Sequence, residues 1–313
     1  MLGPGCPFRG FVLNSTSNSA QRSLLPEPAS LAQRLRAALP RFRHIDWVER
    51  TGSTNADLLE LARTETQPVR PWLLGAHLQD NGRGRAGRTW QNRLGANLMF
   101  SCAFDVFLPA HSLPALSPLA GVAVCEALRG MLEPDNKPLL SLKWPNDLQW
   151  RFSKLAGLLV EVTRSGAIRR SADHHVVIIG LGLNLHDARA LSTSLNRGVA
   201  DWAEVVADDE YARGVEAADI VLAVVAAWTE ALSRVVREGM GGFPQRYSHV
   251  DHLAGQHVAI LDQGRIIQAG IACGVNEHGQ LLIRTPTGVA PVSVGEVSVR
   301  PLPEDRGQLE RSS

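Results

Sequence analysis

The pattern of hydrophobic and polar residues changes twice along the chain, and each change predicts a different kind of structure. Residues 1–30 are rich in Gly, Pro, Ser and Asn without a sustained period, which predicts a mobile extension. From residue 31 to about residue 252, apolar runs of strand length alternate with segments of helical period. Beyond residue 255, only short apolar runs remain, and Gly-containing turns divide them.

These patterns predict individual elements. Helical spacing of apolar residues predicts helices over residues 31–39, 55–63, 116–132 and 220–237. Runs of apolar and β-branched residues predict strands over residues 45–48, 72–76, 98–107, 140–144, 155–163 and 176–181. The last two of these strands are expected to be neighbours. Short strands over residues 257–261, 266–273, 280–284 and 289–299 predict a small C-terminal β-barrel.

The length of 313 residues is typical of two domains. The change from long to short apolar runs predicts a domain boundary near residues 252–255. We therefore expect four segments along the chain. They are a flexible extension over residues 1–40, a large domain over 41–252, a small β-barrel over 253–303 and a flexible tail over 304–313.

Composition narrows the class of protein. The chain has 44% hydrophobic and 20% charged residues, which is typical of a soluble globular protein. Its formal net charge of +1 is not the strong positive charge typical of a nucleic-acid-binding protein. The longest apolar run, residues 220–228, is about half as long as a bilayer crossing requires. Residues 1–22 lack the apolar core of a secretory signal. These features predict a cytoplasmic enzyme.

The cysteines and histidines give no sign of a disulfide framework or a metal cage. The four cysteines are far apart and form no Cys-x-x-Cys pair, so buried thiols are the simpler interpretation. The ten histidines include His174-His175 and His249-x-x-His252, but no Glu stands in metalloprotease spacing. We expect these histidines to be surface or packing residues.

The segment Gly82–Trp90 carries three arginines and three glycines without an acidic residue. Glycine allows successive N–H groups to point to one side, and the planar guanidinium matches phosphate or carboxylate oxygens two at a time. The segment lacks the Lys and the hydroxyl of a Walker loop, and a polar turn separates it from the preceding strand. It therefore predicts an anion-binding loop that is neither a Walker loop nor a typical dinucleotide fingerprint.

A second motif, Lys143-Trp-Pro-Asn-Asp147, ends a predicted strand with an amide and a carboxylate. These groups could bind a nucleotide and its metal, although ordinary turn chemistry explains them equally well. Lys154 follows seven residues after Asp147, the length of a hairpin that would return it beside that carboxylate. A buried ammonium needs such an anionic partner, whereas a solvated lysine at a strand end needs none. The chain has only three lysines against 29 arginines, which gives weight to Lys154.

Two further motifs have both a functional and a structural interpretation. Gly180-Leu-Gly-Leu-Asn184 ends a strand, and its glycines permit close approach of a flat ligand or of another backbone. Ser53-Thr54-Asn55 fits a helix N-cap, with Thr54 and Asp57 in capping-box spacing. The same helix N-terminus could also donate hydrogen bonds to an anion or a carbonyl.

Taken in this order, these motifs make the chain resemble the biotin protein ligases, also called biotin–acetyl-CoA-carboxylase ligases or holocarboxylase synthetases. The resemblance covers about residues 45–299 and rests on the glycine–arginine loop, Lys-Trp-Pro-Asn-Asp, Lys-Leu-Ala-Gly-x-Leu-Val-Glu and Gly-x-Gly-x-Asn. It implies an α+β fold, with a central mixed β-sheet flanked by helices as in class II aminoacyl-tRNA synthetases. The small C-terminal domain would be an SH3-like β-barrel.

The resemblance also implies the activity and the site. Biotin and ATP would react to biotinyl-5′-AMP, and biotin would then pass to one lysine of a biotin carboxyl carrier domain. Catalytic roles fall to Lys154, Arg85 and Asp147. Biotin contacts fall to Ser53, Thr54, Asn55, Gln79, Arg83, Gly84, Arg85, Lys154 and Gly157. Nucleotide contacts fall to Arg83, Arg85, Arg88, Trp90, Lys143, Asn146 and Asn184. Mg²⁺ would arrive with ATP near Asn146 and Asp147, without a protein cage.

Other expectations concern partners and rivals. Relatives that repress transcription carry an N-terminal winged helix-turn-helix, and the roughly 45 residues before the match lack its pattern, so we expect no specific DNA binding. We expect no membrane partner, and a homodimer is compatible with the resemblance. A lipoate ligase of similar fold is the nearest rival enzyme. A nucleic-acid-binding module that uses the arginines and Trp90 is a rival from another class.

Overall fold

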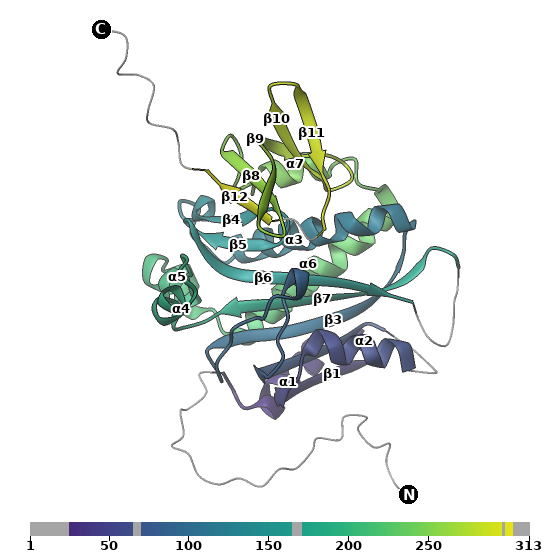
Figure 1. The fold of residues 1–313 in the computed structure, drawn as a ribbon. Coiled ribbons are helices and arrows are strands. Elements are labelled where there is room, and N and C mark those ends of the chain that lie inside the picture. Colours follow the sequence, from purple (N-terminus) through teal and green to yellow (C-terminus); the bar gives the residue numbers. More distant parts are fainter. Residues whose placement is uncertain (1–24, 65–69, 165–170, 296–297, 303–313) are drawn as a thin grey trace, which may run out of the picture.

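The structure, a computed structural model, describes residues 25–64, 70–164, 171–295 and 298–302. A seven-stranded sheet forms the centre of the molecule, with strand order β1-β2-β3-β7-β6-β5-β4. Strands β1 and β2 are parallel, and every other neighbouring pair is antiparallel, so the sheet is mixed. Helices cover both faces (Figure 1). This arrangement confirms the α+β fold expected from the sequence.

The large sheet and its helices have the following bounds. The strands are β1 (His44–Thr51), β2 (Trp72–Gln79), β3 (Asn97–Phe107), β4 (Leu140–Lys143), β5 (Asp147–Trp150), β6 (Ser153–Thr163) and β7 (His174–Asn184). The α-helices are α1 (Pro28–Ala38), α2 (Thr54–Thr64), α3 (Leu116–Arg129), α4 (Ala188–Leu195), α5 (Trp202–Asp208), α6 (Ala217–Glu238) and α7 (Phe243–Ser248). Short 3-10 helices are η1 (Arg85–Gly87), η2 (Ala110–Ala115), η3 (Lys137–Leu139) and η4 (Tyr211–Gly214).

The two faces of the large sheet differ because side chains alternate along each strand. On β3, Leu98, Phe100 and Cys102 point into the main core, where α1, α3 and α6 pack. The residues between them point to the opposite face, where α2 buries Leu58 and Ala62 against a smaller apolar cluster. Helix α2 covers one part of this second face, and the remaining part can line a site.

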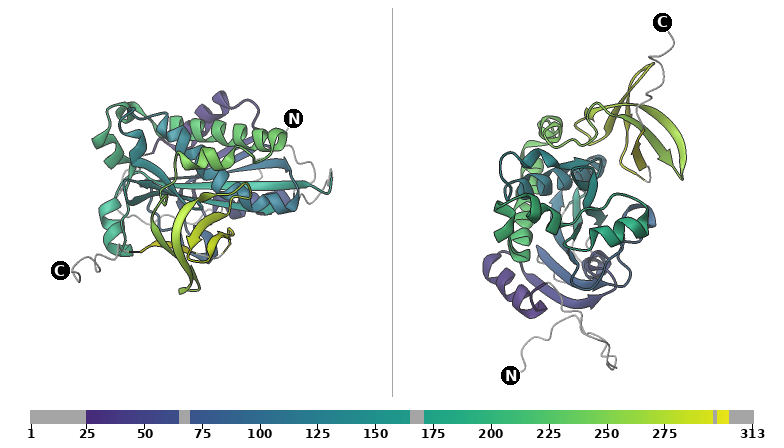
Figure 2. Two further views of the ribbon diagram at one scale, coloured as in Figure 1. Left: turned by 90° about the horizontal axis from the view of Figure 1, so that it is seen from above. Right: turned by 90° about the vertical axis from the view of Figure 1, so that its left-hand side faces the viewer.

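The C-terminal domain is a five-stranded antiparallel sheet with strand order β11-β10-β9-β8-β12. Its strands are β8 (His257–Asp262), β9 (Arg265–Val275), β10 (Leu281–Thr285), β11 (Gly288–Val292) and β12 (Ser298–Pro301). The small sheet stands at one end of the molecule (Figure 2). Trp144 joins it to the large domain by donating a hydrogen bond from Nε1 to the carbonyl of Gly279 at 2.9 Å.

Several predicted elements need correction. The strand expected over residues 289–299 is two strands, β11 and β12, which lie at opposite edges of the small sheet. Four short elements, β5, α4, α5 and α7, were not expected. The predicted helix of residues 31–39 begins at Pro28, and its Leu31 and Leu35 are buried in the main core.

The packing of α1 also bears on the domain division expected from the sequence. The flexible extension was drawn over residues 1–40, but residues 28–38 are helical and belong with the large domain. Residues 1–24 and the tail from residue 303 lie outside the described part. Within the described ranges, no helix is both long enough and apolar enough to cross a membrane.

Candidate active site

A cavity of about 810 Å³ opens on the second face of the large sheet. Fourteen of the fifteen residues proposed from the sequence line it. They are Ser53, Thr54, Asn55, Gln79, Arg83, Gly84, Arg85, Arg88, Trp90, Lys143, Asn146, Asp147, Lys154 and Gly157. The arginines of the Gly82–Trp90 segment and the ammonium of Lys154 therefore face one common cavity.

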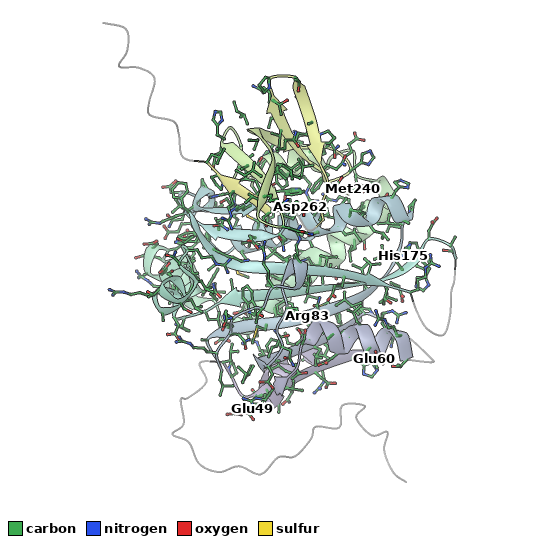
Figure 3. All side chains as sticks on the ribbon, viewed as in Figure 1. Glu49, Glu60, Arg83, His175, Met240 and Asp262 are labelled. Carbon is green, nitrogen blue, oxygen red and sulfur yellow. The ribbon has the colours of Figure 1, made fainter. Side chains whose placement is uncertain are left out.

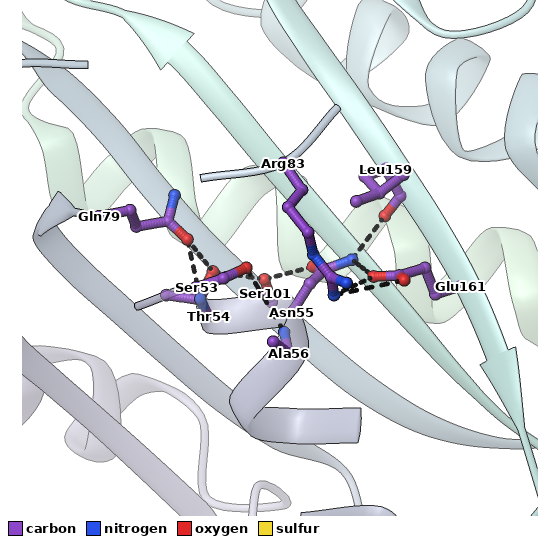
Figure 4. A network of polar contacts seen from close by, with 9 residues as sticks. All are labelled: Ser53, Thr54, Asn55, Ala56, Gln79, Arg83, Ser101, Leu159 and Glu161. Carbon is purple, nitrogen blue, oxygen red and sulfur yellow. Dashed lines mark hydrogen bonds and ion pairs between the residues drawn. The ribbon is translucent and has the colours of Figure 1, made fainter. Parts of the chain in front are cut away.

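One end of the cavity, which we call the neutral end, is made of Ser53, Thr54, Asn55, Gln79 and Ser101 (Figure 4). Ser53, Thr54 and Asn55 are only 4%, 3% and 4% exposed. The Oε1 atom of Gln79 accepts hydrogen bonds from the backbone N–H and the hydroxyl of Thr54, at 2.8 and 3.2 Å. Ser101 donates to Oδ1 of Asn55 at 2.6 Å. These bonds hold the polar groups in fixed directions.

The first turn of α2 differs in detail from the capping box expected there. Thr51, not Thr54, is hydrogen-bonded to the carboxylate of Asp57. Ser53 stands before the helix, and its hydroxyl accepts a long hydrogen bond of 3.5 Å from Ala56 N. The Thr54 hydroxyl instead meets Ser101 Oγ at 2.7 Å. The residue expected to cap the helix therefore belongs to the neutral end.

Residues Gly82–Trp90, here called the flap, form a small hairpin. Arg83 and Thr89 make an antiparallel bridge, and the amide of Trp90 donates to the carbonyl of Gly82 at 2.8 Å. Ala86 and Gly87 form the tip, with φ angles of 52° and 67°. Two left-handed residues in succession are typical of a type I′ turn. In Figure 3, Arg83 lies near the middle of the molecule, in front of the large sheet.

Each arginine of the flap has a protein acceptor. Arg83 lies 3.3 Å from the carboxylate of Glu161 on β6. Arg85 donates to Oδ1 of Asn146 at 3.2 Å and to the carbonyl of Gly295. Arg88 donates to Ser298 Oγ at 2.5 Å. Because Gly295 and Ser298 belong to the C-terminal domain, that domain holds the flap across the cavity.

Lys154 also lines the cavity. Its Nζ lies 2.6 Å from Oδ1 of Asp147, and 5.6 Å from the centre of the Trp90 ring. The side chains of Lys154 and Asp147 are 17% and 29% exposed, so the pair is partly desolvated. The short hairpin between β5 and β6 brings the two residues together, as the sequence predicted. A partly desolvated ammonium at this point can attract a carboxylate or a phosphate.

Three glycines on the second face make room for site side chains. A Cβ on Gly180 would lie 2.2 Å from Oδ1 of Asn55, and one on Gly182 would lie 2.6 Å from the Trp90 ring. A Cβ on Gly157 would lie 3.1 Å from Nζ of Lys154. The close approach expected at the Gly-x-Gly motif is therefore made by side chains of this chain.

The other end of the cavity, here called the cationic end, gathers positive charge from separate segments. Its members are Arg85, Arg88, Lys143, Lys154, Arg197 and Arg300. Burial lowers the pKa of Lys143, the carboxylate of Asp147 opposes this, and nearby cations lower the pKa further. Burial also lowers the pKa of Arg85, which stays charged because guanidinium pKa values lie far above neutrality. This end suits a ligand with several negative charges.

Arg197 and Arg300 were missed from the sequence because neither belongs to a recognisable motif. Arg197 follows α4, and Arg300 lies on β12 of the C-terminal domain. Ser101 was also missed, although a polar residue inside the apolar run of β3 is a usable signal. Glu161, the partner of Arg83, is the last residue of the motif that begins at Lys154, but it was assigned no role from the sequence.

Asn184 is the one proposed residue that does not line the large cavity. It borders a small neighbouring cavity of about 20 Å³. Its Nδ2 donates to the carbonyls of Ala200 and Lys154, at 3.0 and 3.3 Å, and its Oδ1 accepts from Asn97 at 3.1 Å. With its donors and its acceptor engaged inside the protein, Asn184 supports the start of β6 in this structure.

The acceptors that could contribute to a metal site are few. Within the described ranges, no group of three or more His, Cys, Asp or Glu residues could hold an ion. Asn146 and Asp147 place an amide and a carboxylate next to each other at the cationic end. Oxygen donors of this kind suit a hard cation such as Mg²⁺, which commonly keeps substrate phosphates and water as its remaining ligands.

Comparison with known proteins agrees with this site. Residues 47–184 match the model of the biotin/lipoate A/B protein ligase family. Residues 253–300 match the model of the biotin protein ligase C-terminal domain. The first match contains the neutral end, the flap and Lys154, and the second contains Ser298 and Arg300, which line the cavity.

Individual relatives extend the match. The biotin–acetyl-CoA-carboxylase ligase of Paracoccus denitrificans is 30% identical over 254 residues, which are 79% of this chain and 97% of that protein. The bifunctional ligase/repressor BirA of Escherichia coli is 28% identical over 225 residues, 72% of this chain, and the match spans only 65% of its own length. The biotin protein ligase of Aquifex aeolicus, solved with biotin and ATP, has a TM-score of 0.64 at 26% identity and covers 83% of this chain and 100% of its own. The chain belongs to the biotin protein ligase family.

Proposed function

We propose that the chain is an ATP-dependent biotin protein ligase that forms biotinyl-5′-AMP and transfers biotin to a lysine of a biotin carboxyl carrier domain. One observation carries the proposal: a neutral hydrogen-bonding end and a cationic end meet at Lys154 in one cavity. A ligand with a polar uncharged ring and a carboxylate matches the first end. A nucleoside triphosphate matches the second end.

In the first step, an oxygen of the biotin carboxylate attacks the α-phosphorus of ATP, and the bond from that phosphorus to the pyrophosphate oxygen breaks. Both reactants are anions, so the protein must offset their repulsion. Lys154 and Arg85 line the cavity where the two ligands would meet. Cations fixed before the reaction stabilise the charge that develops at phosphorus without reorganising. No side chain of the protein needs to act as a nucleophile.

In the second step, the ε-amine of the carrier lysine attacks the acyl carbon of the mixed anhydride. An amide bond forms, AMP leaves, and the amine loses a proton. Asp147 is the carboxylate beside Lys154 and could accept that proton directly or through water. The flap, held by the C-terminal domain, would keep the intermediate from escaping until the carrier arrives.

Pyrophosphate release tests the proposed function. The protein is mixed with ATP, Mg²⁺ and either biotin or lipoate, and pyrophosphate is measured. We expect release with biotin only, because Asn55, Gln79 and Thr54 offer a rigid polar set for a ureido ring. Release with lipoate alone would support the rival lipoate ligase. Release with neither acid, together with tight binding of polynucleotides, would support the nucleic-acid-binding alternative.

The partner and the metal are part of the same proposal. The Paracoccus relative is a biotin–acetyl-CoA-carboxylase ligase, so the carrier domain of acetyl-CoA carboxylase is the first acceptor to test. Mg²⁺ would be held mainly by the phosphates of ATP, with Asn146 and Asp147 nearby. We also propose cytoplasmic action without specific DNA binding. A sequence-specific gel shift that requires biotin and ATP would contradict the absence of DNA binding.

A further inference from the structure

Glu161 contacts two residues from different segments: Asn55 of the neutral end and Arg83 of the flap. Its Oε2 accepts a hydrogen bond from Nδ2 of Asn55 at 2.9 Å. The same oxygen lies 3.3 Å from Nη2 of Arg83, and Oε1 lies 3.4 Å from that nitrogen (Figure 4). One carboxylate thus joins the neutral end to the flap.

Glu161 is not among the residues that line the cavity. It follows Leu159 by two residues on β6, so both side chains point to the second face of the sheet. Asn55 stands in front of it, 4% exposed, and is fixed by three partners: Glu161, the Leu159 carbonyl and Ser101. Any effect of Glu161 on a ligand must therefore pass through Asn55 or Arg83.

The pair between Arg83 and Glu161 is suited to opening and closing. Its side chains are 43% and 26% exposed, and exposed ion pairs add little to global stability. Both of its contacts are longer than an ideal charge-assisted hydrogen bond. Asn55, by contrast, is held by a shorter bond to the same carboxylate. The contact with Arg83 is therefore the weaker of the two, and it would break first when the flap opens.

Resting on the proposed function, we propose that Glu161 is a positioning residue that couples the neutral end to flap closure. Its carboxylate accepts from Nδ2 of Asn55, which fixes this side chain in the cavity wall, and it also holds Arg83 at the base of the flap hairpin. A ligand that fixes Asn55 also fixes the carboxylate to which the flap attaches. Biotin would in this way favour the closed flap before the intermediate forms.

Two substitutions separate the two contacts. In Glu161→Gln, the side-chain carbonyl can still accept from Asn55, but the charge that attracts Arg83 is lost. In Glu161→Ala, both contacts are lost. We expect Glu161→Gln to raise labelling of bystander lysines about fivefold and to raise the KM for biotin by a smaller factor, because coupling acts in both directions. We expect Glu161→Ala to raise both quantities.

The double variant tests whether Glu161 and Arg83 act together. Arg83→Gln should raise bystander labelling as Glu161→Gln does, and the double variant should exceed neither single variant. Asp187→Asn is the matched control, because it breaks the ion pair of Arg93, 3.2 Å from Asp187, which lies beyond the flap and outside the cavity. Additive effects in the double variant, or an equal rise in Asp187→Asn, would overturn the proposal.

A second measurement does not depend on the reaction. Hydrogen exchange of the flap amides of Gly84 and Trp90, which are bonded within the hairpin, reports flap opening without ligand. We expect exchange to be about fivefold faster in Glu161→Gln and unchanged in Asp187→Asn. Unchanged exchange in Glu161→Gln would overturn the proposal. Faster exchange in a protein that releases no pyrophosphate with biotin would support it and contradict the proposed function instead.

Discussion

The two ends of the cavity are built in opposite ways. The neutral end uses buried side chains from the start of α2 and from β3, together with the half-buried Gln79 of β2, joined by bonds of 2.6 to 3.2 Å. The cationic end uses partly exposed side chains from the flap, the strands around Asp147, the segment after α4 and the C-terminal sheet. The first end is complete within one rigid layer of the fold. The second end is complete only when distant segments come together.

This difference follows from the charge of the groups. Neutral polar groups can satisfy one another inside the protein, so burial fixes them at modest cost. Cations repel one another, and among the described residues Asp147 is the carboxylate that pairs with Lys154. Burying several cations together before any ligand binds would cost a large desolvation free energy. Assembly from separate segments would let the proposed nucleotide supply the missing negative charge.

The largest expected effect comes from removing the charge at the meeting point of the two ends. Lys154→Ala should lower biotin-dependent pyrophosphate release by roughly a thousandfold, because the fixed cation between the two anionic reactants is lost. Lys154→Met keeps the apolar stem and separates the loss of charge from the loss of packing. Lys137→Ala, outside the cavity, is the matched control. Pyrophosphate release at the wild-type rate in Lys154→Ala would show that Lys154 has no role in forming the adenylate.

The flap gives the next effect. Arg85 contacts Asn146 and the C-terminal domain, so Arg85→Ala should free the flap and release the intermediate. We expect labelling of bystander lysines to rise roughly tenfold to a hundredfold, since hydrogen bonds to charged groups are worth about 1.5–3 kcal/mol. Mass spectrometry of added proteins measures it, with Arg93→Ala as the control. An unchanged labelling pattern would show that the flap does not retain the intermediate.

Two glycines of β7 allow each end to be blocked separately. In Gly180→Ala, the new methyl would meet Asn55, and in Gly182→Ala it would meet Trp90. Overpacking of this kind costs about 1–3 kcal/mol, which corresponds to about fivefold to a hundredfold in affinity. Gly180→Ala should raise the KM for biotin and spare that for ATP, and Gly182→Ala should do the reverse.

The two glycine variants are controls for each other, because both add one methyl to the same strand and the same face. Isothermal titration with each ligand alone would confirm the kinetic result. If both variants weakened both ligands equally, the two ends would not be separate, and the comparison drawn above would fail.

The sequence predicted the large sheet and the neutral end well, for a physical reason. Long apolar runs such as residues 98–107 have a clear period, and the Ser53, Thr54 and Asn55 set is contiguous. The cationic end was predicted only in part. Arg300 lies on β12, which was merged with β11 into one strand predicted from the sequence. Arg197 follows α4, a helix that was not predicted. Proximity that depends on distant segments leaves no local pattern.

The smallest expected effect is a pH dependence confined to the cationic end. The pKa of Lys143 lies below its ordinary value of 10.5 because the residue is buried among cations. Between the lowered pKa and 10.5, the unfolded chain binds more protons than the folded chain at this residue, so its contribution to folding stability rises with pH in that window. Ligand binding follows the opposite trend, because the ammonium that attracts phosphate is lost.

We therefore expect the KM for ATP to rise by about twofold to fivefold as the pH increases toward 10.5, while the KM for biotin stays flat. Lys143→Arg should remove this rise, because guanidinium stays protonated throughout. Lys137→Arg is the control and should behave as the wild type. A rise in the KM for biotin, or a rise for ATP that persists in Lys143→Arg, would show that another group titrates and that the neutral end is not insulated from charge.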